Sequence, residues 1–544
     1  GQSRRIKGTA SRQAKRRGIR MPPWARAWPW LPLAVVLAAG DGSPPRVLDA
    51  SAPTGMDILE FQEKGKDDAT WVLTSSFIIL TMQSGFGLLE AGSVSEKFQV
   101  NIMMKNVIDV IFGGLSYWMV GYGISHGTSF HGLMGTNNFF LNSQGTVEEM
   151  VASDLHVDVF SQYIFQFSFA ATATTIVSGA VAGRMKFTTY SAFSFFNTVI
   201  YCLPAHWILS PNGWLMQMGM VDFAGDGPVH LMGGLTAAVG AWMVGTRPGR
   251  WNPTRQKEFT LQSPNNCIFG LFLLWWGWLG FNCGSTFGIS DNKWLVASRT
   301  AITTINASIG GGIFGVLVTP LVQRRNIFLV EDCVNGILSG LVAITAGCAS
   351  VSPAASLAIG FVGAAASWAT NMALLRTRLI DDPVGAVGVH GAGGAVGLIC
   401  VGLFSNQELI GSGVERSGLF YGGGLGLLGV QLLGILVTAV WSVLTALVSF
   451  KVLDLTIGIR GSKEDIEVGF DQVEHQVQPP PCPPPHPELR AELDALRQEL
   501  EALRAKTCSE ATLGAAEAEE AEQPKEALVA VTLELLPTTI ATNV

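Results

Sequence analysis

Long apolar segments alternate with short polar loops over most of this chain. From about residue 69 onward, eleven apolar runs come near the roughly 20 residues that a helix needs to cross a bilayer. The runs are 69–91, 103–125, 158–183, 189–209, 222–245, 266–283, 299–322, 332–350, 354–374, 383–404 and 420–450. This pattern predicts an all-α polytopic membrane protein with eleven transmembrane helices.

Positive charge is unevenly distributed between the predicted loops. Alternate loops, counted from the first, carry twelve Lys and Arg residues, whereas the loops between them carry only Lys293, Arg299 and Arg416. Cytoplasmic loops collect positive charge. The N-terminus is therefore expected outside and the C-terminus inside.

Two stretches far apart in the sequence share one pattern. Asp222 stands eight residues before His230, Asp382 stands eight residues before His390, and each His precedes a run rich in small residues. The two histidines fall in the fifth and tenth predicted spans, which divides the spans as five plus five plus one. An odd number of spans inverts the second copy, so a pseudo-two-fold axis in the membrane plane would bring both histidines to the centre.

Composition agrees with a membrane protein. Charged residues make up 14% of the 544 residues, against about 25% in soluble domains. The 63 glycines suit closely packed membrane helices. The 8 cysteines show no metal spacing or disulfide framework. No nucleic-acid partner is expected.

The remaining segments have their own character. Residues 1–40 are expected to be a leader with a signal peptide, or alternatively an interfacial anchor, followed by an extracellular segment at 41–68. After the membrane domain (69–450) come the segments 451–478 (cytoplasmic regulatory tail), 479–487 (Pro-rich linker), 488–506 (short coiled coil) and 507–544 (disordered tail). The leucines of 488–506 are spaced 4, 3, 4, 3, as in a heptad seam. Its helix would clamp an oligomer or bind another partner.

The paired histidines carry the candidate chemistry. A single histidine in a membrane helix is most often a packing residue, but two in matching positions indicate a pathway. A catalytic zinc needs three protein ligands, and the spans offer no third at suitable spacing, so neither metal nor cofactor is expected. The two neutral imidazoles can share a proton and hydrogen-bond a small polar molecule in a dry pore.

The aspartates and aromatic residues allow two interpretations each. Asp222 and Asp382 open predicted helices, where each can cap backbone N–H groups, and for Asp382 capping is preferred. The aromatic residues of the third and sixth spans can attract a cation by about 0.5–2 kcal/mol, or form an interfacial belt. The Ser285 hydroxyl can accept a hydrogen bond from a donor-rich cation.

Five motifs resemble those of the ammonium transporter (Amt/Mep) family of the Amt/Mep/Rh superfamily, and they occur in the same order as in that family. They are Gln83–Gly92, Asn101–Asn106, Asp222–His230, Gly280–Ser285 and Asp381–Gly391. The resemblance runs from about 69 to 475 and implies a homotrimer in a lipid bilayer, with one pore in each subunit.

The resemblance also implies roles for individual residues. Phe169 and Phe281 would form a stacked gate above the pore, and Ser285 would bind ammonium outside it, supported by the buried acid Asp222. The residues expected to bind substrate are Ser285, Phe169, Phe281, Trp278 and Asp222. The residues expected along the pore are His230, His390 and Phe165.

Three positions depart from the family pattern. Leu209 stands where many members have Trp at the outer cation site, and Trp207 or Trp214 would have to compensate. Asp226 adds a carboxylate near a helix start, and Gly385 replaces an acid at the inner exit.

The expected function is ammonium transport, with methylammonium as an analogue and the plasma membrane as the location. Ammonium would lose a proton near the Phe gate, because an unpaired cation in a dry pore costs tens of kcal/mol by Born estimates. The alternative is an ammonium sensor whose C-terminal extension signals, with little net transport. An intramembrane hydrolase is less favoured, because no nucleophile or metal cluster accompanies the histidines, so the protein is not expected to be an enzyme.

Loop labelling tests the predicted orientation. A membrane-impermeant thiol reagent should reach a cysteine introduced into 127–157 in intact cells, since that loop holds no Lys or Arg. A cysteine in 246–263 should react only after permeabilisation. The opposite pattern would overturn the orientation.

Overall fold

The computed structural model describes residues 55–142, 158–324, 326–410, 416–477 and 495–503, and almost all of its regular structure is helical. The helices of the first half are α3 (Gly55–Leu80), α4 (Met82–Ser93), η2 (Glu96–Phe98), α5 (Gln99–Ile108), η3 (Asp109–Gly113), α6 (Gly114–Ser116), η4 (Tyr117–Gly121), α7 (Tyr122–His126), η5 (Phe139–Leu141), α9 (Val159–Ala180), α10 (Phe187–Leu209), α11 (Trp214–Gln217), η6 (Asp226–Leu231) and α12 (Met232–Val244). Strands β1 (Ser129–Phe130) and β2 (Met134–Gly135) form a small antiparallel hairpin.

The second half continues in the same way. Its helices are η7 (Pro253–Phe259), α13 (Pro264–Gly284), α14 (Lys293–Gln323), α15 (Val330–Thr345), α16 (Pro353–Thr377), η8 (Val387–Ala392), α17 (Gly393–Phe404), α18 (Gln407–Ile410), η9 (Leu419–Tyr421), α19 (Gly426–Thr456), α20 (Lys463–Val468) and α21 (Phe470–His475). Each of the eleven apolar ranges predicted from the sequence overlaps helical structure. Within the described residues, eight helical stretches are long and apolar enough to cross a membrane. The chain is thus a helical, multi-pass membrane protein.

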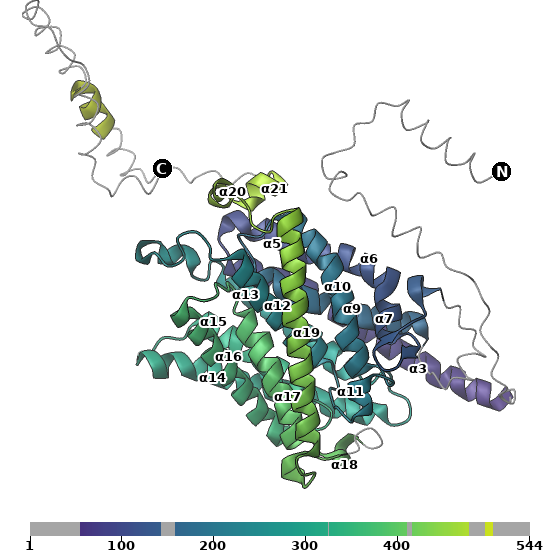
Figure 1. The fold of residues 1–544 in the computed structure, drawn as a ribbon. Helices are drawn as coiled ribbons and strands as arrows, with labels where there is room; N and C mark the ends of the chain where they lie inside the picture. Colours follow the sequence, from purple (N-terminus) through teal and green to yellow (C-terminus); the bar gives the residue numbers. More distant parts are fainter. Residues whose placement is uncertain (1–54, 143–157, 325, 411–415, 478–494, 504–544) are drawn as a thin grey trace, which may run out of the picture. The chain divides into compact units, whose positions relative to one another are not determined.

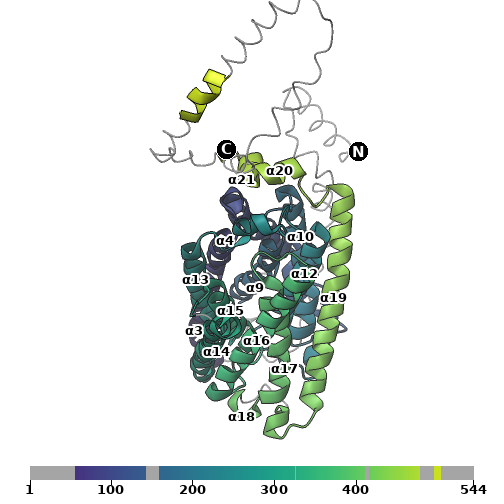
Figure 2. The ribbon, with the colours of Figure 1, turned by 90° about the vertical axis from the view of Figure 1, so that its left-hand side faces the viewer.

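The long helices form a bundle within the compact unit that ends at Gln478. Helix α19 runs along one side of the bundle, and α20 and α21 follow it at the end of the bundle opposite α18 (Figures 1 and 2). In the second unit, residues 495–503 are helical, and Leu496, Leu500 and Leu503 are 49%, 52% and 56% exposed. The predicted leader, the whole linker, both ends of the predicted coiled coil and the last tail lie outside the described residues.

Local sequence signals explain where several helices begin. Asp158 accepts hydrogen bonds from the N–H groups of Phe160 (2.9 Å) and Ser161 (3.0 Å), which caps α9. Ser352 caps α16 in the same way and is followed by proline. A capping side chain followed by proline is a favourable helix start, because it satisfies free N–H groups and fixes the first φ angle.

Glycine lets helices approach closely where the bundle is tightest. A Cβ atom on Gly311 of α14 would overlap the carbonyl oxygen of Gly336 in α15. Small residues at such crossings are the usual means of packing membrane helices, because lipid gives little hydrophobic drive for helices to associate. The bundle interior is therefore fixed by backbone contact as well as by side-chain packing.

The segment after α19 folds back and completes two helices of the bundle. The Asp471 carboxylate accepts hydrogen bonds from the N–H groups of Val100 (2.9 Å) and Asn101 (2.7 Å), at the start of α5. Glu474 accepts one from the N–H of Phe187 (3.0 Å), the first residue of α10. Neither helix has a side-chain cap from its own N-cap residue, so the tail supplies these caps from far away in the sequence.

Removing one of these caps should weaken the fold. Asp471→Ala is expected to lower the free energy of unfolding by about 0.5–2 kcal/mol, the usual effect of losing a helix cap. Thermal unfolding of the detergent-purified protein measures this change. Glu464→Ala is the control, because Glu464 lies in the same tail but is exposed. Equal melting temperatures for the two variants would contradict the capping role.

Candidate functional site

His230 and His390 lie against each other in the buried centre of the bundle. Their Nδ1 atoms are 3.2 Å apart, and their ring centroids are 5.2 Å apart with planes 17° from parallel. His230 is fully buried and His390 is 4% exposed. A hydrogen bond between two Nδ1 atoms requires that one nitrogen carries the proton and the other accepts it.

Both histidines sit in the same unusual backbone conformation. His230 belongs to the π-helical turn η6 and His390 to the π-helical turn η8, each of which leads into a regular α-helix. Such turns are rare and are often found at functional sites. The two segments cross at glycines, because a Cβ on Gly234 would overlap the backbone of Gly391. This close crossing allows the two imidazoles to meet.

Aromatic rings enclose His230. The Trp278 ring stacks on His230 at a centroid distance of 5.0 Å and an angle of 15°, and Phe281 is 5.7 Å away. The Trp278 indole N–H donates to Thr345 Oγ1 at 3.0 Å, which fixes the orientation of the ring. The Nε2 atom of His230 is buried and has no hydrogen-bond partner among the described residues.

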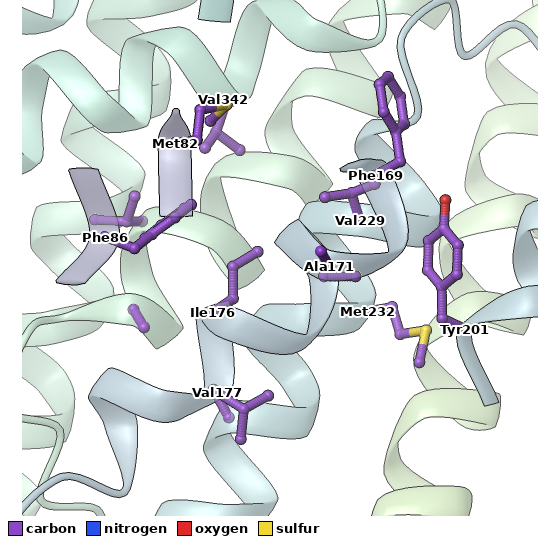
Figure 3. Packing of buried hydrophobic residues seen from close by; sticks show 14 of the residues in the cluster. Met82, Phe86, Phe169, Ala171, Ile176, Val177, Tyr201, Val229, Met232 and Val342 are labelled. Atoms are coloured by element: carbon purple, nitrogen blue, oxygen red, sulfur yellow. The ribbon is translucent and has the colours of Figure 1, made fainter. Parts of the chain in front are cut away.

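Phe169 and Phe281 form a stacked pair next to this centre. Their centroids are 3.9 Å apart and their planes differ by 7°. Phe165 follows at 5.0 Å from Phe169, and all three rings are buried. Figure 3 shows Phe169, Val229 and Ile176 among the packed apolar side chains of this region. The Phe169–Phe281 pair contacts His230 on one side and a cavity on the other.

That cavity, here named the Ser285 cavity, has a volume of about 380 Å³. Ser285 donates its hydroxyl hydrogen to the carbonyl oxygen of Phe281 (2.8 Å), which leaves its own oxygen free to accept. Asp222 accepts from the N–H groups of Asp226 and Gly227, both at 2.7 Å. Its carboxylate thus caps η6, while Asp222 also lines the cavity.

Three further polar residues of the Ser285 cavity were not among the predicted site residues. They are His126, Gln162 and Gln166. Gln166 stands between the phenylalanines of the third predicted span, and this position in the sequence could have indicated that it lines the site. His126 lies just after the second predicted span, and no sequence pattern connects it with the other site residues.

Neither tryptophan that was expected to compensate for Leu209 lines the Ser285 cavity. Leu209 lines the Ser285 cavity, but neither Trp207 nor Trp214 does. The Trp207 indole N–H donates to the carbonyl oxygen of Leu133 (2.8 Å), and its ring packs on Trp441. Trp278 also lies outside this cavity, beside His230.

Two cavities lie on the other side of the histidine pair. The smaller, here named the His390 cavity, has a volume of about 20 Å³. The larger, here named the Asp381 cavity, has a volume of about 280 Å³. Val384 and Ala386 line the His390 cavity, and Pro383 and Gly385 line the Asp381 cavity. The segment 383–386 therefore separates the two cavities.

Ion pairs organise the Asp381 cavity. Arg247 binds the Asp381 carboxylate through Nε (2.9 Å) and Nη2 (2.8 Å), and Arg250 adds a contact at 3.3 Å. Burial alone would raise the pKa of the Asp381 carboxyl, but the hydrogen bonds from Arg247 and the charge of Arg184 hold it well below its ordinary value. Asp381 therefore stays ionised, and its carboxylate holds Arg247 and Arg250 in place.

Asp382 next to it has the capping role that the sequence favoured. Its carboxylate accepts from the N–H groups of Val384 (3.2 Å), Gly385 (3.0 Å) and Val387 (2.8 Å). Gly385 has φ +74° and lies close to Asn371, so a side chain at this position would be strained.

In the ranges that the structure describes, no three His, Cys, Asp or Glu side chains come together as metal ligands. The six described cysteines are free.

Comparisons with known proteins point to one family. A sequence model of the Ammonium Transporter Family matches residues 70–479. A Caenorhabditis elegans protein named putative ammonium transporter 3 is 40% identical over 419 residues, which cover 75% of this chain but only 60% of that protein. Ammonium transporter Amt2 of Archaeoglobus fulgidus is 35% identical over 445 residues, covering 78% of this chain and 90% of the relative.

Solved structures show the same fold. A structure titled sensor Amt protein has a TM-score of 0.68 and 30% identity, covering 76% of this chain and 99% of the other. The crystal structure of Candida albicans Mep2 has a TM-score of 0.67 and 26% identity, covering 74% and 88%.

Proposed function

The chain belongs to the ammonium transporter family, and from this membership we propose that it carries ammonium or ammonia across a membrane, the plasma membrane being the expected one. One observation carries the proposal. The Ser285 cavity, the phenylalanine pair, the histidine pair and the two cavities beyond follow one another through the bundle. The relatives' transporter names also support transport and a non-enzymatic role.

The Ser285 cavity is the proposed entry site. Ammonium donates hydrogen bonds, and the free lone pairs of Ser285 accept one. The Phe165 and Phe169 rings present faces that attract a cation. Asp222 holds the backbone beside this site and adds negative charge to it, while its hydrogen bonds to η6 keep it from binding the cation directly.

Deprotonation at the Phe169–Phe281 pair follows from the dry path beyond it. An unpaired cation there would cost tens of kcal/mol by Born estimates, whereas a neutral amine costs only the hydrogen bonds it fails to recover. The unpartnered Nε2 of His230 offers ammonia such a bond. Potassium has neither a proton to release nor hydrogens to donate, so the same path excludes it.

The proposed topology has eleven spans, arranged as a five-plus-five inverted repeat and a final helix. The matching π-helical turns at His230 and His390 support the repeat. The positive loop residues Arg184 and Arg247 lie near the residues after α19, which supports a cytoplasmic location for that end. The N-terminus would then be outside, in keeping with a signal peptide.

A homotrimer is the proposed assembly, with the heptad segment 488–506 as a clamp that joins the three chains. The helix at 495–503, with half-exposed leucines at heptad spacing, supports a clamp. One similar structure is titled a sensor, but the sequence relatives compared above are named transporters, and a path through the bundle would be unnecessary for sensing alone. The sensing alternative is therefore not favoured.

Replacing the histidines tests the pore. His230→Ala is expected to reduce labelled methylammonium uptake by about tenfold or more, because ammonia loses a hydrogen-bond partner in a dry site. Ammonium-evoked current, recorded in the same cells, separates transport from sensing. His131→Ala is the control, since His131 is an exposed histidine of the β1–β2 turn.

The same experiment has a second arm at His390. His390→Glu is expected to let cations pass, because a fixed negative charge stabilises them. Wild-type uptake by the double variant His230→Ala, His390→Ala would refute the proposed pore.

An aromatic residue at Leu209 should strengthen capture. Leu209→Trp is expected to lower the half-saturating ammonium concentration about twofold to thirtyfold, the equivalent of one cation–π contact. Leu209→Met is the control for side-chain size without an aromatic face. No difference between the two variants would mean that the phenylalanines already supply all the cation–π attraction.

A further inference from the structure

Glu90 is a buried carboxylate that the proposed mechanism leaves unused. It lies in α4, is 2% exposed, and lines the His390 cavity together with His390 itself. Most of the other lining residues are apolar, among them Phe86 and Ile176, which Figure 3 labels. A cavity of about 20 Å³ has room for one water-sized molecule, and ammonia is of that size.

Two donors hold Glu90 in place. Asn106 donates from Nδ2 to Glu90 Oε2 at 2.8 Å, and the Ser178 hydroxyl lies 2.6 and 2.7 Å from the two carboxylate oxygens. Asn106 is itself oriented, because Thr175 donates to its Oδ1 at 2.6 Å. A carboxylate has about four accepting positions. Two donors therefore leave it capacity for a donor in the cavity.

Ser178 also allows Glu90 to hold a proton. The Ser178 hydroxyl lies 2.7 Å from the carbonyl oxygen of Thr175 as well as next to the carboxylate. When Glu90 is ionised, Ser178 donates to it. When Glu90 is protonated, its O–H can donate to Ser178, which then donates to the Thr175 carbonyl. Neither state leaves a buried donor or acceptor without a partner, which would be unfavourable.

We propose that Glu90 exchanges a proton with ammonia directly beyond the histidine pair, an inference that rests on the proposed transport function. Protonated Glu90 gives its proton to the nitrogen lone pair. An N–H bond forms, the O–H bond breaks, and an ammonium–carboxylate pair results. The ammonium leaves through the Asp381 cavity, and the carboxylate regains a proton from a hydronium ion of the water there.

The surroundings of Glu90 include other ionisable groups. Lys105 and Asp109 face it from the neighbouring helix segments α5 and η3, and His390 faces it across the cavity. The Lys105 ammonium donates to the carbonyl oxygen of Met185 at 2.9 Å, and Asp109 accepts from the Tyr190 hydroxyl at 2.8 Å. Neither Lys105 nor Asp109 lines the cavity, whereas Glu90 does.

The test compares variants of the full-length protein in cells where the wild type takes up labelled methylammonium. Glu90→Gln keeps the shape and one accepting oxygen but cannot exchange a proton. Its initial uptake rate is expected to fall about tenfold with an unchanged half-saturating concentration, since binding occurs before the gate. The rate that remains should no longer depend on internal pH. Glu90→Asp should restore part of the rate.

Controls separate this role from a purely structural one. Glu96→Gln makes the same chemical change at an exposed glutamate of η2 and should transport normally. If Glu90→Gln does not reach the surface, Ser178→Ala provides the test, because it leaves the carboxyl but should shift the internal-pH dependence. Wild-type rates and pH dependence in Glu90→Gln, or in Ser178→Ala, would overturn the inference. A wild-type protein without uptake or current would instead refute the transport function.

Discussion

The centre of the structure depends on a single hydrogen bond between two imidazoles that are buried away from water. His230 and His390 can meet at 3.2 Å only because their backbones cross at Gly234 and Gly391. A polar group without a partner is unfavourable in such a place. The Trp278 and Phe281 rings pack beside His230, whose Nε2 is buried and has no hydrogen-bond partner among the described residues.

Carboxylates satisfy the free backbone N–H groups at the starts of several helices. Asp222 and Asp382 satisfy the N–H groups where the two histidine-bearing segments begin, and Asp471 does the same for α5. Asp381 instead gathers arginines. Most of these acidic groups thus fix the backbone or hold positive charges. Glu90, which lines a cavity, differs from them in having accepting capacity to spare.

The sequence predicted the helical character and the histidine pair for physical reasons. Runs of about 20 apolar residues have few stable alternatives to helices in lipid, and all eleven runs overlap helices. The Asp–His spacing, repeated at 222–230 and 382–390, indicated that the two histidines would meet. Hydropathy could not predict the π-helical turns, because they depend on how the two segments cross. It could not place Trp278 beside His230 rather than in the Ser285 cavity, for the same reason.

The capping of α5 and α10 by Asp471 and Glu474 has a consequence for the order of synthesis. These two helices emerge from the ribosome early, whereas the carboxylates that complete them are made more than 280 residues later. The first half of the bundle can insert into the membrane but remains unfinished at one end until translation has passed the last span. A chain cut short before residue 471 would thus carry two exposed helix ends, which quality-control machinery could recognise as the mark of an incomplete protein.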